Sequence, residues 1–214
     1  LGVSAIPLRQ VCRAQFKDLA WPDGAAWQSD VLALWRGAEF REERYAAIEL
    51  TGVKAARPFH DLSALPMYEE MIVTGAWWDF VDAIAGQRLW AILQNEATEM
   101  KPVLLDWSTD ADMWKRRSAI LCQLRAKEQT DLDFLYACIA PSLDSKEFFL
   151  RKAIGWALRQ YAWTDPAEDE DRMAAARAFG GALAPFASGV YVNALFEQGP
   201  EGVRRAYGDA KLAR

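Results

Sequence analysis

The sequence predicts an all-α fold, organised as a curved, HEAT-like helical-repeat solenoid. Apolar residues recur near every 3.6 positions in residues 113–125 and 146–163, which is the spacing of an amphipathic helix. Runs of alternating β-branched residues, which are typical of strands, are absent. A dipeptide that returns at a nearly constant interval is the third observation, because such a period indicates a repeat protein.

The dipeptide Ala-Ile defines the repeat. Four of its six occurrences, at residues 47–48, 83–84, 119–120 and 153–154, are separated by intervals of 36, 36 and 34 residues. Such a period is typical of a two-helix unit, as in HEAT, armadillo and TPR arrays. The small alanine permits close approach of neighbouring helices, and the isoleucine fills the layer between them. We therefore expect the four pairs at equivalent points of successive repeats, whose stacking forms a concave face.

Acidic and hydroxyl side chains mark where two of these helices should begin. Asp110 and Asp112 precede the helix expected in residues 113–125 and are candidate caps. Asp144 or Ser145 should cap the helix expected in residues 146–163.

Charge is distributed unevenly along the 214 residues. The net charge of −5 argues, taken alone, against a nucleic-acid partner. Residues 114–160 nevertheless hold nine Lys or Arg against five Asp or Glu, whereas residues 165–171 hold five acids and no base. This contrast indicates a local basic patch on a protein that is acidic overall.

The same composition indicates a cytoplasmic protein that does not enter a membrane. No apolar run approaches the roughly 18 residues needed to span a bilayer, and no signal segment opens the chain. Cys12, Cys122 and Cys138 stand among apolar neighbours, so we interpret them as reduced core residues. His60 is the single histidine and cannot build a His-based metal site by itself. No metal or other cofactor is predicted, and His60 is interpreted as an ordinary packing or surface residue.

Two segments, residues 69–82 and 145–162, combine aromatic and charged residues at helical spacing. Trp78 and Asp82 are four residues apart and share a helix face, as do Trp156 and Arg159, three apart. A carboxylate beside an indole is partly desolvated, which is costly unless the carboxylate is paired. The structural alternative is that Asp82 pairs with an arginine of the next repeat, such as Arg117, and that Trp78 only packs.

Three longer motifs resemble the AlkD family of bacterial DNA alkylation repair glycosylases. They are IVTGAWWDFVDAIA, WKRRSAILCQL and SKEFFLRKAIGWALRQYA, the last followed by Thr164-Asp165-Pro166. The resemblance runs over about residues 1–166. It implies that Trp78 and Trp156 flank the damaged nucleotide through its sugar and backbone. It also implies that Asp82 faces the anomeric carbon and that Arg117 contacts the DNA backbone near the lesion.

The expected partner is double-stranded DNA that contains alkylated purines. Basic residues of the later repeats should form a cluster on the concave face, where they would follow the phosphate backbone. The DNA-binding residues expected from this reasoning are Lys115, Arg117, Arg125, Lys127, Arg151 and Arg159.

The predicted reaction is hydrolysis of the N-glycosidic bond of a purine alkylated at N3 or N7. Such a purine is cationic and leaves as a neutral base, so no general acid is needed. Negative charge from Asp82 would stabilise the developing oxocarbenium ion, as glycosidase carboxylates do. No lysine lies within the Trp78–Asp82 segment, which favours a monofunctional enzyme over a Schiff-base lyase. The resemblance further implies that the base is not flipped into a pocket, which would admit bulky adducts.

The expected domains are a HEAT-like repeat glycosylase domain at residues 1–165 and a tail at residues 166–214. Residues 1–13, LGVSAIPLRQVCR, resemble an internal stretch of the family, so one or two N-terminal helices are expected to be missing. The second segment comprises an acidic linker and a tail that does not follow the family. That tail resembles the C-terminal end of berberine-bridge-type FAD-linked oxidases, on the cues Gly189–Asn193 and Ala206–Gly208. Nothing resembles the flavin-attachment motifs, so no flavin function is predicted.

Two other functions compete with the enzyme. One is a non-catalytic HEAT-repeat scaffold that binds DNA or protein, and the other is an oxidase remnant. Asp82 and both tryptophans favour the enzyme, whereas missing N-terminal helices favour lost activity. The protein is expected to act as a monomer.

Overall fold

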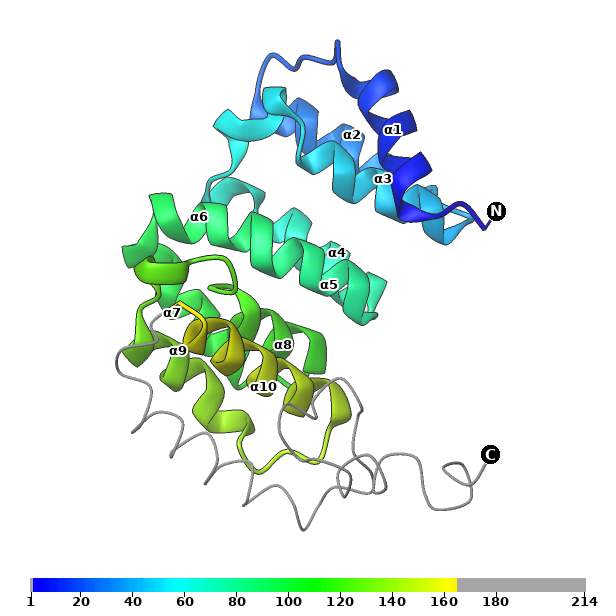
Figure 1. Ribbon diagram of the computed structural model, residues 1–214. Helices are drawn as coiled ribbons and strands as arrows, with labels where there is room; N and C mark the ends of the chain where they lie inside the picture. The colour runs from blue at the N-terminus through cyan, green and yellow to red at the C-terminus, as the bar shows by residue number, and fades with distance from the viewer. Residues whose placement is uncertain (1, 165–214) are drawn as a thin grey trace, which may run out of the picture. The chain divides into compact units, whose positions relative to one another are not determined.

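The computed structural model describes residues 2–164, which form helices and connecting loops with no strand among them (Figure 1). The chain divides at Asp165, and every element described below belongs to the first unit. The predicted all-α repeat fold is confirmed for these residues. The tail expected at residues 166–214, with its oxidase-like cues, lies outside them.

The principal helices pack in layers in which each repeat contributes a pair. One row, here called the Ala-Ile row, contains α3 (Arg41–Thr51), α5 (Trp78–Ala83), α8 (Met113–Leu121) and α10 (Phe148–Ala162). Against it pack α2 (Gly24–Arg36), α4 (Leu65–Gly75), α7 (Ala97–Ser108) and α9 (Leu132–Ile139). The chain begins with α1 (Ala5–Phe16), which packs on α3, and α6 (Trp90–Asn95) precedes α7.

The four periodic Ala-Ile pairs occupy the Ala-Ile row, one pair to each helix or its direct continuation. Successive members of the row contact each other, α3 with α5, α5 with α8 and α8 with α10. The four isoleucines are buried, none of them more than 4% exposed. Burial of an isoleucine contributes roughly 1.5–3 kcal/mol. The predicted register is therefore confirmed, and these residues form the spine of the core.

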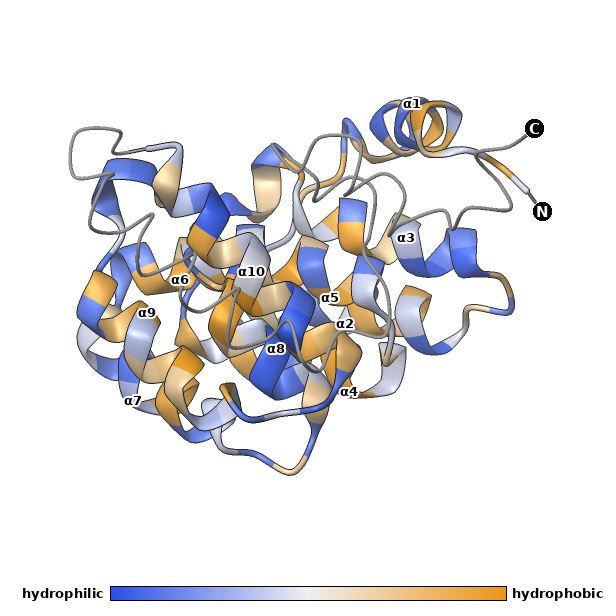
Figure 2. Cartoon of the chain, turned by 60° about the horizontal axis from the view of Figure 1, so that its bottom comes forward, coloured by the Kyte–Doolittle hydropathy of each residue, from blue (hydrophilic) through white to orange (hydrophobic). Residues whose placement is uncertain are grey.

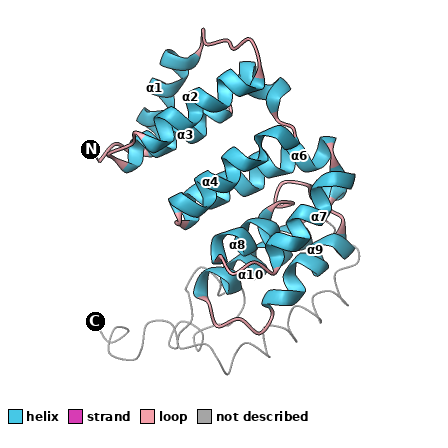
Figure 3. Cartoon of the chain, turned by 180° about the vertical axis from the view of Figure 1, so that it is seen from behind, coloured by secondary structure: helices cyan, strands magenta, loops and turns pink. Residues whose placement is uncertain are grey.

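The amphipathic pattern that predicted the helices is visible on the folded chain. Hydrophilic and hydrophobic residues alternate around each helix (Figure 2), and the apolar positions face the neighbouring layer. Seen from behind, the helices again lie in layers joined by short loops (Figure 3). None of the helices described is long and apolar enough to cross a membrane.

Aspartates begin several of the helices, because their side chains accept hydrogen bonds from otherwise unpaired backbone amides. Asp23 caps α2, Asp112 caps α8 and Asp131 caps α9. The choice between Asp110 and Asp112 thus falls on Asp112. The start of α10 was predicted wrongly, because the helix begins at Phe148 and Glu147 precedes it without a side-chain cap.

The helix that starts with α5 contains a π-helical segment at Ile84–Leu89 and then continues as α6. Such segments are rare and occur often at functional sites. This one begins two residues after Asp82. Its Arg88 donates to Thr51 Oγ1 over 2.8 Å, and a Cβ on Gly52 would lie 2.2 Å from the Arg88 guanidinium. A side chain at position 52 would therefore require the Arg88 guanidinium to shift.

His60 and the cysteines are core residues. His60 is 7% exposed, with Nε2 at 2.9 Å from the Thr51 carbonyl oxygen and Nδ1 at 3.2 Å from the Tyr68 hydroxyl. Its interpretation as a packing residue is therefore correct, and burial lowers the pKa of its imidazole. The three cysteines are free and buried, as expected.

Candidate functional site

The turn between α4 and α5 presents two adjacent indoles to solvent. α4 ends at Gly75, and Ala76 adopts a left-handed conformation with φ of 43°, which is uncommon for a residue other than glycine. Trp77 and Trp78 follow and remain 42% and 44% exposed. Indoles that are this exposed are not core residues, so a large part of Trp78 is open to a ligand.

Asp82 lies one turn beyond Trp78 and forms a bidentate ion pair with Arg117 of α8. Arg117 Nε donates to Asp82 Oδ1 over 2.7 Å, and Nη2 donates to Oδ2 over 2.8 Å. The Arg117 side chain is only 4% exposed and the Asp82 side chain 11% exposed. The pairing that the sequence suggested as an alternative is therefore present. Asp82 is a fixed, largely buried carboxylate beside an exposed indole.

Arg117 also connects this pair to a third helix. Its Nη1 donates a hydrogen bond to the backbone carbonyl of Phe149, in the first turn of α10. One guanidinium thus joins α5, α8 and α10. Each of its three nitrogens donates one hydrogen bond within the protein, and its side chain is only 4% exposed, so most of this arginine is engaged inside the fold.

Burial raises the pKa of Asp82, and the hydrogen bonds and charge of Arg117 oppose the rise. The nearby Asp79 carboxylate also raises it, as the smallest of these effects. The charge on Asp82 therefore depends on Arg117. A carboxylate that is desolvated and held by a specific partner is a recognised mark of a functional site, although structural ion pairs share it.

Phe149 forms the centre of an aromatic group that the sequence analysis missed. Its ring centroid lies 5.9 Å from that of Trp77 and 5.1 Å from that of Trp114, and the Arg117 guanidinium lies 5.9 Å from it. Arg41 approaches Trp77 from α3, with 5.8 Å between guanidinium carbon and ring centroid. A usable signal was present for Trp77, because it directly precedes Trp78. Phe149 acts on Arg117 through a backbone oxygen, for which the sequence has no signal.

Trp156 lies on α10, two turns after Phe149 and on the same side of the helix. It is partly exposed. Seven residues correspond to about 10 Å along a helix axis. No hydrogen bond or ring contact within the described chain joins Trp156 to Trp78 or Asp82. The structure thus pairs Asp82 with Arg117 one helical turn from Trp78, and in the described chain it joins Trp156 to none of these residues by such a contact.

The six residues expected to bind DNA separate into two groups. Lys115 is 13% exposed and forms ion pairs with Glu69 over 2.8 Å and with Asp110 over 2.7 Å, so its charge is already compensated. Arg117 is buried in the pair described above. The remaining four are at least partly exposed and lie in the segment after α8 or on α10: Arg125, Lys127, Arg151 and Arg159.

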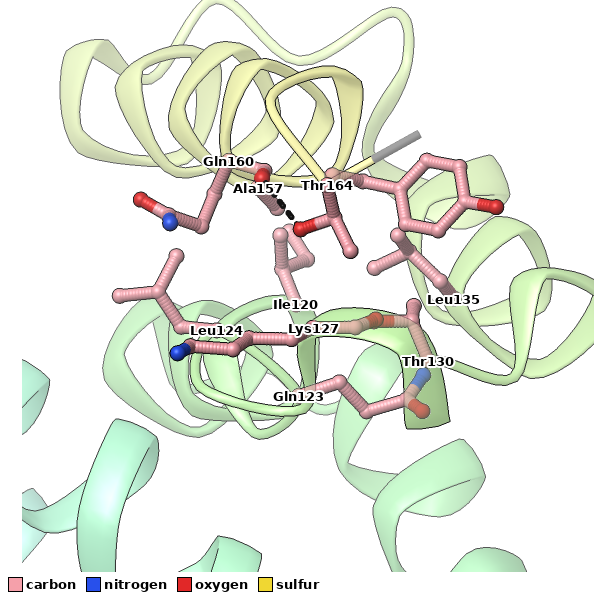
Figure 4. Close-up of a pocket in the computed structure, with 10 residues that line it drawn as sticks. Ile120, Gln123, Leu124, Lys127, Thr130, Leu135, Ala157, Gln160 and Thr164 are labelled. Carbon is pink, nitrogen blue, oxygen red and sulfur yellow. Dashed lines mark hydrogen bonds between the residues drawn. The ribbon is translucent and has the colours of Figure 1, made fainter. Parts of the chain in front are cut away.

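A shallow hollow lies between α8, α9 and α10, and neither Asp82 nor Arg117 lines it. Its polar lining residues are Gln123, Lys127, Thr130, Gln160, Tyr161 and Thr164. Thr164 Oγ1 donates a hydrogen bond to the Gln160 backbone carbonyl over 3.3 Å (Figure 4). The hollow contains none of the expected catalytic residues. No cluster of three potential metal ligands occurs in the part of the chain that the structure describes.

These features define an all-α helical-repeat protein whose surface site combines exposed indoles with an arginine-held carboxylate. Residues 1–177 match the family model described as "DNA alkylation repair enzyme", and the chain belongs to that family. The match extends past Pro166, where the motifs had ended. A solved structure, a predicted DNA alkylation repair enzyme from Enterococcus faecalis, is 28% identical with a TM-score of 0.67, and the match covers 87% of this chain and 88% of that one. No curated protein matches.

Proposed function

We propose that this protein is a monofunctional DNA N-glycosylase that acts, as a monomer, on cationic N3- or N7-alkylated purines in duplex DNA. One observation carries the proposal, the Asp82 carboxylate fixed by Arg117 one helical turn from the exposed Trp78. Membership of a DNA alkylation repair family supports it.

The chemistry needs little more than this site offers. The bond between C1′ and the purine nitrogen breaks with its electron pair going to the base, which neutralises the positive charge of the base. The sugar is left as an oxocarbenium ion, which a nearby carboxylate stabilises. Water then adds to C1′ and releases a proton, for which Asp82 is the acceptor. The faces of Trp78 and Trp156 favour cationic groups and would hold the nucleotide through its sugar.

Arg117 has a different role in this proposal from the one that the resemblance implies. Three of its five N–H groups donate to Asp82 and the Phe149 carbonyl, and its side chain is 4% exposed. We therefore assign Arg117 as a positioning residue, which fixes the carboxylate and favours its charged form. DNA phosphates would be bound by the four basic residues that are at least partly exposed, Arg125, Lys127, Arg151 and Arg159.

The test is release of base from duplex DNA that carries 7-methylguanine or 3-methyladenine. We expect single-turnover release of the methylated purine and no measurable release of uracil, because nothing at the site protonates a neutral leaving base. Chromatography of the freed base checks both. Release of uracil at a comparable rate would show that the reaction does not depend on a cationic base.

Binding to duplex DNA should weaken steeply with salt, because phosphate contacts release counterions. Four contacts predict a slope of about −3.6 in log K against log [salt]. Arg125→Gln and Arg159→Gln should each reduce the slope by about 1. Arg13→Gln, at an exposed position of α1, is the matched control and should leave the slope unchanged. An affinity that stays flat between about 50 and 200 mM salt would contradict the assigned surface.

A non-catalytic DNA-binding repeat is the second candidate function. The observation that favours it is the Asp82–Arg117 pair itself, since a purely structural ion pair would look the same. In that case the protein would bind duplex DNA with the salt dependence above and release no methylated base.

A further inference from the structure

Gly155 lies in the middle of α10 and faces solvent. Glycine is the least favourable residue in a helix interior apart from proline, because it restricts the unfolded chain least and adds no side-chain contact. A glycine at such a position usually reflects a backbone angle or a close neighbour that only glycine permits. Within residues 2–164, neither reason holds.

The surroundings of Gly155 leave room for a side chain. A Cβ built on it meets no atom within 4 Å, and its φ is not positive. Gly52 is the contrast, because its missing Cβ makes way for Arg88. Among the described glycines with ordinary φ, Gly155 alone meets nothing. No contact within the described chain therefore requires glycine at position 155.

The residues around Gly155 on the helix surface indicate why glycine occupies this position. Arg151 lies four residues before it and Arg159 four residues after it, so the three share one stripe of the helix. The two arginines are separated by about 12 Å along the axis. Trp156 is adjacent in sequence, and Phe148, 61% exposed, begins the same stripe. Two long cationic side chains thus border a stretch of bare helix backbone.

We propose that Gly155 forms a notch in which the sugar–phosphate backbone of DNA contacts the α10 backbone directly. The inference rests on the proposed function, because it uses Arg151 and Arg159 as phosphate ligands. Without a Cβ at position 155 the strand lies closer to the helix, which brings both guanidinium groups to adjoining phosphates and the sugar against Trp156. Gly155 is a positioning residue that acts through the absence of a side chain.

The proposal predicts opposite effects on folding and on DNA binding. Gly155→Ala and Gly155→Leu should each raise the thermal midpoint of unfolding, by about 2–4 °C for a domain of this size. Affinity for duplex DNA at fixed salt should fall about fivefold with Ala and about tenfold or more with Leu, because the added atoms occupy the notch. Base release should fall in the same order. A purely structural glycine would not separate these readouts.

Ala137→Leu is the control. It adds similar bulk to an exposed position of α9, in the second row of helices, and should change neither affinity nor release. Wild-type affinity and release in Gly155→Leu, with an active wild-type protein, would overturn this inference alone. A wild-type protein that binds duplex DNA but releases no methylated base would overturn the glycosylase, whereas the affinity ranking of the variants would still decide the notch. No duplex binding by the wild type would overturn both.

Discussion

Asp82→Asn should reduce excision of a methylated purine by about 10²–10³-fold, the cost of losing one electrostatic contact to a transition state. The substitution keeps the shape of the side chain and removes the charge that stabilises the oxocarbenium ion. Affinity for undamaged duplex DNA should hold or rise slightly, because a carboxylate repels phosphates. Single-turnover release and a binding titration on the same preparation measure the two effects.

Stability must be followed in the same experiment. Removing the charge of Asp82 leaves Arg117 buried without its anionic partner, and breaking such a pair costs about 3–5 kcal/mol. Thermal unfolding would show whether the variant is folded at the assay temperature. Asp79→Asn is a suitable control, because it removes the carboxylate of another interhelical arginine pair, Arg41–Asp79, on the same helix α5. Its excision rate should stay within a few-fold of wild type. Full excision by folded Asp82→Asn would show that Asp82 is not the catalytic carboxylate.

The parts of the fold that follow from burial could be predicted from the sequence. Ile48, Ile84, Ile120 and Ile154 repeat because each fills the same layer, so their spacing reports the stacking of helices. Asp82 and Arg117 are 35 residues apart, close to one repeat, which is why their pairing could be suggested in advance. Asp112 could be predicted as a cap because a short acidic side chain accepts hydrogen bonds from nearby backbone amides, here those of Trp114 and Lys115.

The parts of the site that the sequence did not predict depend on backbone geometry and on competition between charges. The left-handed turn at Ala76 decides that Trp77 and Trp78 are exposed, and alanine has no preference for that conformation. The Phe149 carbonyl receives Arg117 as a backbone atom, which any residue there would supply. Lys115 is a basic residue of the kind that binds DNA phosphates, but in the fold it forms ion pairs with Glu69 and Asp110. Proximity of that kind is not visible in a linear pattern.

Arg117→Lys should move the acidic limb of the excision profile to higher pH. Excision requires ionised Asp82, and burial already raises the pKa of this carboxyl, so in the wild type the rate falls as the pH drops through that raised pKa. Arg117 lowers the pKa through two hydrogen bonds and its charge. Lysine keeps the charge but cannot form the bidentate pair and also reach the Phe149 carbonyl. The pKa of Asp82 should therefore rise, and a larger fraction of enzyme should be protonated at any given acidic pH.

Arg117→Met should reduce excision more than Arg117→Lys does. Comparing the two variants separates a role of Arg117 in positioning Asp82 from a purely structural role. Arg117→Met removes the partner altogether, which should destabilise the fold by about 3–5 kcal/mol and greatly reduce excision at neutral pH. Loss of excision by itself could follow from misfolding. A shift of the pH profile in Arg117→Lys could not follow from misfolding, because loss of stability alone does not change the pKa of Asp82 in molecules that remain folded. Single-turnover rates across about pH 5 to 8, at a temperature where thermal unfolding shows Arg117→Lys to be folded, measure the shift. An unchanged acidic limb, together with a lower thermal midpoint, would reduce Arg117 to a structural link between α5, α8 and α10.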